Sequence, residues 1–232
     1  DYTMRPELDT LRRIPWLDGT ALVLCNILDH HGHDEIAHAP RTMLRRQIER
    51  LAALGLQALA ATELEFFHFD ASYEQLNAEG FRRLQPVSAY NEDYHIFQTT
   101  KEEDLMRRIR NGLYGAGIPV ENTKGEAEVG QEEVNVRYGP VLLTADHHTL
   151  TKQACKEIAW SLGRSVSFMA KWNENKVGSS SHVHMSLTDM EGNPVGLDPD
   201  AGHGMSETMR RFVAGQVAHA LEYLAFLAPY TN

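Results

Sequence analysis

The chain has 232 residues, of which 42% are hydrophobic and 23% charged, and its formal net charge is -10 at pH 7. This length and composition predict one domain with a sizeable hydrophobic core, and they exclude a mainly disordered protein. The surplus of carboxylates argues against a nucleic-acid-binding protein, which needs a basic surface to displace counterions from phosphates, but it suits a protein that binds metal ions.

Strands and helices alternate along the chain. The apolar run at 20–29 predicts a strand, Pro40 suits the first position of a helix, and Thr100 with Glu103 forms a capping-box pattern that opens another helix. In chain order, the predicted elements are a strand at 20–29, a helix at 40–54, a strand at 56–69, a helix at 100–117, strands at 120–122 and 130–138, a helix at 142–163, strands at 165–171 and 182–187, and a helix at 205–227. No G-x-x-x-x-G-K-[ST] or G-x-G-x-x-G motif is present, which disfavours P-loop and Rossmann sites, and no linker or repeat divides the chain.

The segment Glu63-Leu64-Glu65 places two carboxylates in an apolar strand. Because side chains alternate along a strand, both carboxylates point to the same face. Two like charges in a half-buried setting repel each other and lose hydration, so they require a metal ion, a raised pKa or a cationic partner. The segment therefore indicates either a metal site or a pair of carboxylates that are solvated or bound to arginines.

Two later segments supply further candidate ligands. The sequence KGEAEVGQEE, which ends at Glu133, places several carboxylates around two glycines. In GSSSHVHMS the strand alternation puts His182, His184 and Ser186 on one face after a flexible Gly/Ser loop. The simpler interpretations are an acidic surface turn for the first segment and ordinary core or surface histidines for the second.

Together these segments offer carboxylates and imidazoles without cysteine, a donor set that suits Mg²⁺ or Mn²⁺ rather than a structural zinc. Cys25 and Cys155 lie far apart in apolar surroundings and predict neither a disulfide nor a cysteine metal site. Two metal ions that bridge phosphate oxygens would suit phosphoryl transfer. The histidine-rich stretch at 29–34, in contrast, is expected to be a solvated turn rather than a cluster of ligands.

Five motifs occur in order along the chain: ELEFF, VENTKGEAEVGQEEVNVRY, ADHHTLTKQACKEIA, SFMAKW and GSSSHVHMSL. In this order they resemble the catalytic domain of glutamine synthetase over nearly the whole chain. The resemblance implies an α+β fold with a curved, mainly antiparallel sheet and flanking helices, similar to that of guanidino kinases. It also implies that residues 1–232 form an incomplete catalytic domain, with an amino-terminal β-grasp domain and the carboxy-terminal part of the catalytic domain absent from this chain.

The resemblance implies roles for individual residues. The two implied metal sites consist of Glu65, Glu126 and Glu133 for the metal beside the glutamate substrate, and of Glu63 with His182 for the metal on the nucleotide phosphates. The residues implied to contact substrates are Glu121, Tyr138, His184 and Ser186 along the ATP site and Gly178 at the glutamate backbone.

The activity implied by the resemblance is that of an ATP-dependent carbon-nitrogen ligase with two Mg²⁺ or Mn²⁺ ions per site. It would form γ-glutamyl phosphate, which ammonia or an amine then attacks. Asn122-Thr123-Lys124-Gly125 stands where ammonia-using members carry a run of histidines, which is more similar to the branch that joins glutamate to polyamines or ethanolamine. We expect these 232 residues alone to be inactive.

A homo-oligomeric, dodecamer-like ring is implied for the intact protein. No apolar run approaches the roughly 18 residues of a membrane span, and no signal peptide is recognisable, so we expect a cytoplasmic protein without a membrane partner. Two other interpretations stay open: a non-catalytic relative with a structural or regulatory role, and an unrelated metal-dependent phosphotransferase that yields a phosphorylated product without an amide.

Overall fold

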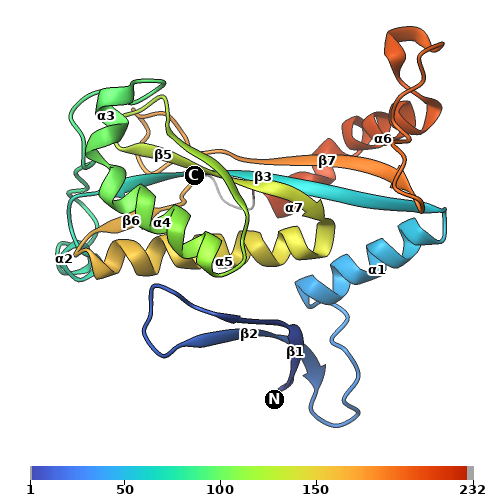
Figure 1. The fold of residues 1–232 in the computed structure, drawn as a ribbon, viewed down its shortest axis with the longest axis horizontal. Helices are drawn as coiled ribbons and strands as arrows, with labels where there is room; N and C mark the ends of the chain where they lie inside the picture. Colours follow the sequence, from blue (N-terminus) through green and yellow to red (C-terminus); the bar gives the residue numbers. More distant parts are fainter. Residues whose placement is uncertain (1, 229–232) are drawn as a thin grey trace.

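The computed structural model describes residues 2–228 and arranges them as two antiparallel sheets with flanking helices (Figure 1). The smaller sheet pairs β1 (Tyr2–Arg13) with β2 (Ala21–Asp29). The strands of the larger sheet are β4 (Val120–Gly125), β5 (Gln131–Pro140), the central β3 (Leu56–Phe69), and β6 (Ser165–Ser167) and β7 (Ser181–Asp189), which share the far edge of β3. Every strand pair is antiparallel, which confirms the expected α+β fold.

The helices are α1 (Pro40–Ala52), α2 (Tyr73–Ala78), α3 (Ile96–Lys101), α4 (Glu103–Gly115), α5 (Val141–Ser161), the short 3₁₀ turn η1 (Gly202–Gly204), α6 (Glu207–Ala218) and α7 (Ala220–Leu227). Helices α4 and α5 contact each other, and Figure 1 shows both along one side of the larger sheet. Among residues 2–228, no helix combines the length and the apolar character that crossing a membrane requires.

The hydrophobic core lies between the larger sheet and helices α4 and α5. Phe66 of β3 and Val134 of β5 pack with Ile109 of α4 and Ile158 of α5, and all four are buried. Because successive side chains of a strand point to opposite faces, this packing leaves the odd-numbered residues of β3 from Ala61 to Glu65, and their partners on β5, on the face that the helices do not cover.

The hairpin of β1 and β2 packs on the other side of α5 from the sheet (Figure 1). The indole of Trp16, in the hairpin loop, donates a hydrogen bond of 2.7 Å to Glu157 of α5. At the other end of α5, Arg41 of α1 forms an ion pair with Asp146 at 3.1 Å and also contacts Asn26 of β2. Helix α5 therefore joins the hairpin to the larger sheet.

Most predicted elements are present, and three differ. The capping box predicted at Thr100 and Glu103 is wrong, because Thr100 lies inside α3, where its hydroxyl donates to the carbonyl of Ile96, and α4 starts after Glu102 without a side-chain cap. The predicted helix at 205–227 is two helices, since His219 leaves helical geometry with φ −108° and ψ 16°. The predicted strand at 165–171 is reduced to the three residues of β6.

Four elements were not predicted, namely β1, α2, α3 and η1, and the last three have only six, six and three residues. Residues 2–9 of β1 alternate between apolar and polar, but Pro6 within the run argues against a strand, because proline lacks the N–H that a strand donates. The strand forms by pairing with β2. Helix α2 has only six residues, too few to show a helical period, and is capped by reciprocal hydrogen bonds between Ser72 and Gln75.

Candidate functional site

A row of charged side chains crosses three strands on the face that the helices leave open. Glu65 of β3 lies directly opposite Glu133 of β5, and Glu133 lies opposite Lys124 of β4. Like charges opposite each other in a sheet destabilise it unless a cation lies between them. We call these three residues the carboxylate row.

Glu126, just after the end of β4, brings a third carboxylate to this row. Glu65, Glu126 and Glu133 each offer an oxygen within 4.8 Å of the others, and we call them the carboxylate triad. Glu133 is only 3% exposed, and burial raises its pKa. Three oxygens this close fit a hard divalent cation such as Mg²⁺ or Mn²⁺. The structure thus brings together the three carboxylates that the family resemblance assigned to one metal.

Lys124 is the cation that faces the triad in this structure. Its Nζ lies 2.7 Å from Glu126 Oε1 and 3.5 Å from Glu133 Oε1. The hydrogen bond to Glu126 raises the pKa of Lys124, because it favours the charged ammonium form. One ammonium group balances only part of the charge of three carboxylates.

Glu65 of the triad is held by Ser180, which lies just before β7, and by Gln131 at the start of β5. The backbone N–H of Ser180 donates to Glu65 Oε2 at 2.9 Å, the Ser180 hydroxyl donates to Oε1, and Gln131 Nε2 donates to Oε2 at 3.0 Å. Gln131 also donates to the carbonyl of Gly178 at 3.0 Å. A Cβ on Gly178 would lie 2.7 Å from the carbonyl oxygen of Ala170, so this close approach requires glycine.

Replacing Ser180 by Ala should weaken metal binding at the triad. The change removes the hydroxyl that orients Glu65 and keeps the backbone N–H donor, so we expect about a tenfold loss of Mn²⁺ affinity, at the low end for a group that orients a ligand. Calorimetric titration of the full-length protein measures it. Ser181→Ala is the matched control, because Ser181 is the exposed neighbour and should leave affinity unchanged. Equal affinities for both variants would contradict the orienting role.

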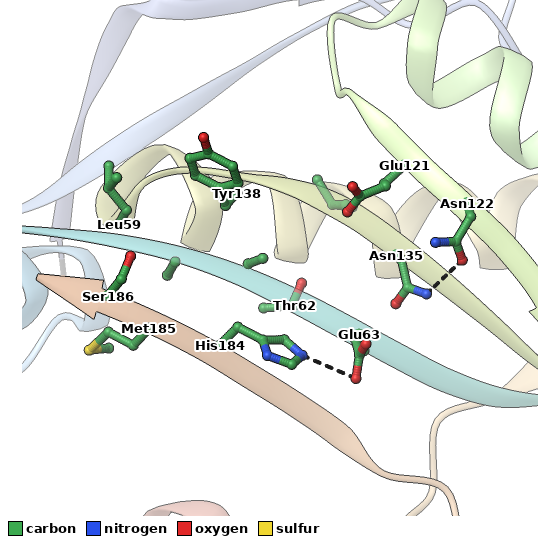
Figure 2. A pocket seen from close by; sticks show the side chains of 13 residues that line it. Leu59, Thr62, Glu63, Glu121, Asn122, Asn135, Tyr138, His184, Met185 and Ser186 are labelled. Carbon is green, nitrogen blue, oxygen red and sulfur yellow. Dashed lines mark hydrogen bonds and ion pairs between the residues drawn. The ribbon is translucent and has the colours of Figure 1, made fainter. Parts of the chain in front are cut away.

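A second row of polar side chains crosses the same face next to the carboxylate row. His182 of β7, Glu63 of β3, Asn135 of β5 and Asn122 of β4 lie opposite one another in turn. Glu63 Oε2 lies 3.4 Å from His182 Nδ1 and 3.2 Å from His184 Nε2, the latter contact being drawn in Figure 2. Both imidazoles are largely exposed. This row offers one carboxylate and two imidazole nitrogens as ligands. Phosphate oxygens could complete the coordination of a Mn²⁺ or Mg²⁺ ion bound there.

Asn135 connects the two rows. Its Nδ2 donates to Glu133 Oε1 at 2.7 Å and to Asn122 Oδ1 at 2.8 Å, and the second bond is drawn in Figure 2. The same amide therefore touches a member of the triad and the wall of the neighbouring cavity.

A cavity of about 380 Å³ lies beside the second row, over β3, β5 and β7 (Figure 2). Glu63 lines it, and so do the four residues that the family resemblance assigned to the nucleotide, namely Glu121, Tyr138, His184 and Ser186. Tyr138 is 67% exposed and presents a free aromatic face. The cavity is also lined by Thr62, Asn122 and Asn135, which were not assigned to the nucleotide.

Behind the triad, a buried carboxyl pair lies on the helix side of β5. Glu132 and Glu92 are 1% and 0% exposed, and burial together with the neighbouring Glu92 raises the pKa of Glu132 well above its usual range. A neutral carboxyl group can donate a hydrogen bond to its partner, which lowers the cost of burying both. Strand alternation places Glu132 on the core side, but nothing in the sequence indicates Glu92 as its partner.

The histidine-rich turn at 29–34 is solvated, as expected. Its three histidines are exposed, and the Asp29 carboxylate accepts hydrogen bonds from the backbone N–H groups of His31 and Gly32 at 2.9 and 2.6 Å. Within residues 2–228, the triad is the only group of three or more His, Cys, Asp or Glu side chains that lie close enough together to hold a metal ion.

Comparison with known proteins gives one family for this site. The profile described as "Glutamine synthetase, catalytic domain" matches residues 37–232. A gamma-glutamylethanolamide synthetase of Streptomyces coelicolor is 44% identical over all of this chain and 49% of its own length. A glutamate–isopropylamine ligase of a Pseudomonas species is 37% identical over all of this chain and 50% of its own length. The chain thus spans about half the length of the curated relatives it matches.

Solved structures share the fold. A complex of GmaS with ADP superimposes with a TM-score of 0.87 over 99% of this chain and 51% of that one, at 23% sequence identity. GmaS without ligand gives a TM-score of 0.83 over 95% of this chain. At this identity the likeness establishes the arrangement of strands and helices described above.

Proposed function

Because the chain belongs to the glutamine synthetase family, we propose that the full-length protein is an ATP-dependent ligase that joins the γ-carboxylate of glutamate to an amine. The observation that carries the proposal is the register of β3, β5 and β4, which gathers a carboxylate triad beside a cavity lined by the residues assigned to the nucleotide. The names of two relatives support the same reaction class, since they describe enzymes that join glutamate to ethanolamine or isopropylamine.

In this proposal the two rows of side chains bind different cations. The triad of Glu65, Glu126 and Glu133 holds a divalent cation beside glutamate. Gly178, which shares the donor Gln131 with Glu65, lies at the glutamate backbone. Glu63 and His182 hold a second cation at the nucleotide phosphates. The nucleotide itself lies along the cavity lined by Glu121, Tyr138, His184 and Ser186.

Divalent cations at these positions would neutralise charge while the γ-phosphoryl group moves to the glutamate carboxylate. The protein's own contribution is to fix its donors before the substrates arrive. Gln131 and Ser180 orient Glu65, and Asn135 orients Glu133, so the carboxylates need little rearrangement during the reaction. The resulting γ-glutamyl phosphate is then open to attack by the amine.

The amine substrate and the assembly form the finer part of the proposal. Asn122-Thr123-Lys124-Gly125 precedes Glu126, and the matched relatives named for ethanolamine, isopropylamine and methylamine favour an amine over ammonia. We assign Mg²⁺ or Mn²⁺ as the cations and a homo-oligomeric ring as the assembly of the full-length protein.

The test is ADP release by the full-length protein with glutamate and a panel of ammonia, ethylamine, ethanolamine, isopropylamine and a polyamine. We expect glutamate-dependent ADP release that rises at least about tenfold with one amine over ammonia, because a pocket that fits a substrate group discriminates by this much or more. Mass spectrometry should find the matching γ-glutamyl amide. ADP release with a phosphorylated product and no amide would instead establish a phosphotransferase, and no ADP release with any amine would contradict a ligase.

A further inference from the structure

Lys124 has an unusual position for a lysine beside a metal site. The register of β4 and β5 puts it directly opposite Glu133, at the end of the carboxylate row. Its Nζ reaches two members of the triad, Glu126 at 2.7 Å and Glu133 at 3.5 Å. An ammonium group there is bound by oxygens that a metal ion would also need.

The Lys124 side chain also has a second favourable contact, away from the carboxylates. Its side chain is 34% exposed, and its Nζ lies 5.3 Å from the centre of the Tyr94 ring, close enough for a cation–π contact. Lys124 and Tyr94 both line a cavity of about 370 Å³, which residues of β4, α3 and α4 border. A flexible four-carbon side chain can therefore leave the carboxylates without losing every favourable contact.

We propose that Lys124 is a tethered counterion that competes with the divalent cation for the carboxylate triad. Without a metal, its ammonium group relieves the repulsion among the three carboxylates and keeps them together. When a metal binds, the ammonium group withdraws towards Tyr94, because two cations so close together repel each other. The competition lowers metal affinity, and the ammonium group holds the carboxylates in place when no cation is bound.

This inference rests on the proposed metal site and adds a residue that sets its affinity. Lys176 offers a matched comparison on a nearby loop. It is 35% exposed and forms an ion pair of 3.1 Å with Glu128, a carboxylate outside the triad. It therefore shares the charge, exposure and ion pairing of Lys124 but not the position.

The experiment titrates Mn²⁺ into the full-length protein by calorimetry, with electron paramagnetic resonance to count bound ions. Lys124→Met keeps the length of the side chain and removes the charge, and we expect Mn²⁺ to bind the triad about tenfold more tightly, a gain of about 1.4 kcal/mol. Lys124→Arg keeps the charge and should stay within about threefold of the wild type, allowing for the different geometry of the guanidinium group. Lys176→Met should match the wild type.

A second measurement uses the unmodified protein and does not depend on folding of a variant. Chemical acetylation of Lys124, read by mass spectrometry with Lys176 as the internal reference, should rise several-fold when Mn²⁺ is added, because Nζ, which reacts as the neutral amine, is then no longer shielded by its carboxylate partners. Equal or weaker Mn²⁺ binding by Lys124→Met, or labelling of Lys124 that Mn²⁺ does not increase, would overturn the proposal.

The two proposals fail in different ways. If Glu126→Gln binds as many Mn²⁺ ions as the wild type, the triad is not a metal site, and both the proposed metal site and the role of Lys124 are wrong. If Glu126→Gln loses one ion while Lys124→Met binds no more tightly than the wild type, only the role of Lys124 is wrong.

Discussion

Replacing Glu126 by Gln should remove one bound Mn²⁺ per subunit from the full-length protein and reduce ligase activity by roughly a thousandfold. The substitution keeps the size of the side chain but removes one of three carboxylates that lie within 4.8 Å of one another. Loss of a group that merely orients a ligand costs about 10- to 100-fold, so loss of a ligand itself should cost more. It also leaves Lys124 with a weaker partner, since Glu126 is the nearer of its two contacts.

Calorimetry and electron paramagnetic resonance count the ions, and ADP release with the preferred amine measures the activity. Glu128→Gln is the matched control, because Glu128 lies two residues further along the same loop and pairs with Lys176 rather than with the triad. It should keep both ions and retain activity within a few-fold of the wild type. An unchanged ion count in Glu126→Gln would show that the metal binds elsewhere.

Replacing Gly130 by Ala should lower the free energy of unfolding by about 3 kcal/mol, from backbone strain and overpacking together. Gly130 has a φ of +70°, and a Cβ there would lie 2.7 Å from Pro86 Cβ and 3.0 Å from the carbonyl oxygen of His68. The loop ends next to Gln131, whose carbonyl accepts the N–H of Glu126 at 2.7 Å. Displacing this loop should therefore also disturb the triad.

Gly117→Ala separates the two causes. Gly117 has a similar φ of +77°, but nothing lies within 4 Å of a Cβ built there, so this variant should lose only about 1 to 2 kcal/mol from strain. Urea unfolding of both variants in the presence of a chelator gives the difference, and Mn²⁺ titration shows whether the triad is affected. If both variants lose the same stability and both keep wild-type Mn²⁺ affinity, the contacts of Gly130 do not position the loop.

The sequence predicts well what depends on a strand alone. The apolar run of LQALAATELEFFHF predicts β3 at the residues where it is found, because its length and aromatic content leave little alternative. The period of two then predicts that Glu63 and Glu65 share a face, and the rows on the sheet bear this out. The same period placed His182, His184 and Ser186 together, and the last two line the cavity.

What depends on register between strands was not predictable. Lys124 faces Glu133 only because β4 and β5 pair with a particular offset, and an irregularity between Val120 and Asn122 shifts that register. Likewise, Ser180 reaches Glu65 across more than a hundred residues of sequence. The capping box at Thr100 failed for a related reason, since α3 precedes α4 and places that hydroxyl inside a helix. Local pattern shows which side chains share a face, and tertiary pairing decides what surrounds them.

The amide of Asn135 contacts both halves of the site. Its Nδ2 donates to Glu133 of the triad and to Asn122, which lines the neighbouring cavity. If a ligand in that cavity shifts this amide, the effect is reciprocal, so the ligand would change cation affinity at the triad by the same factor as the cation changes the affinity for the ligand. The order in which the cation and the ligand bind would then depend on the Asn135 side chain. In an Asn135 variant, titration with the cation would no longer depend on whether the ligand is bound.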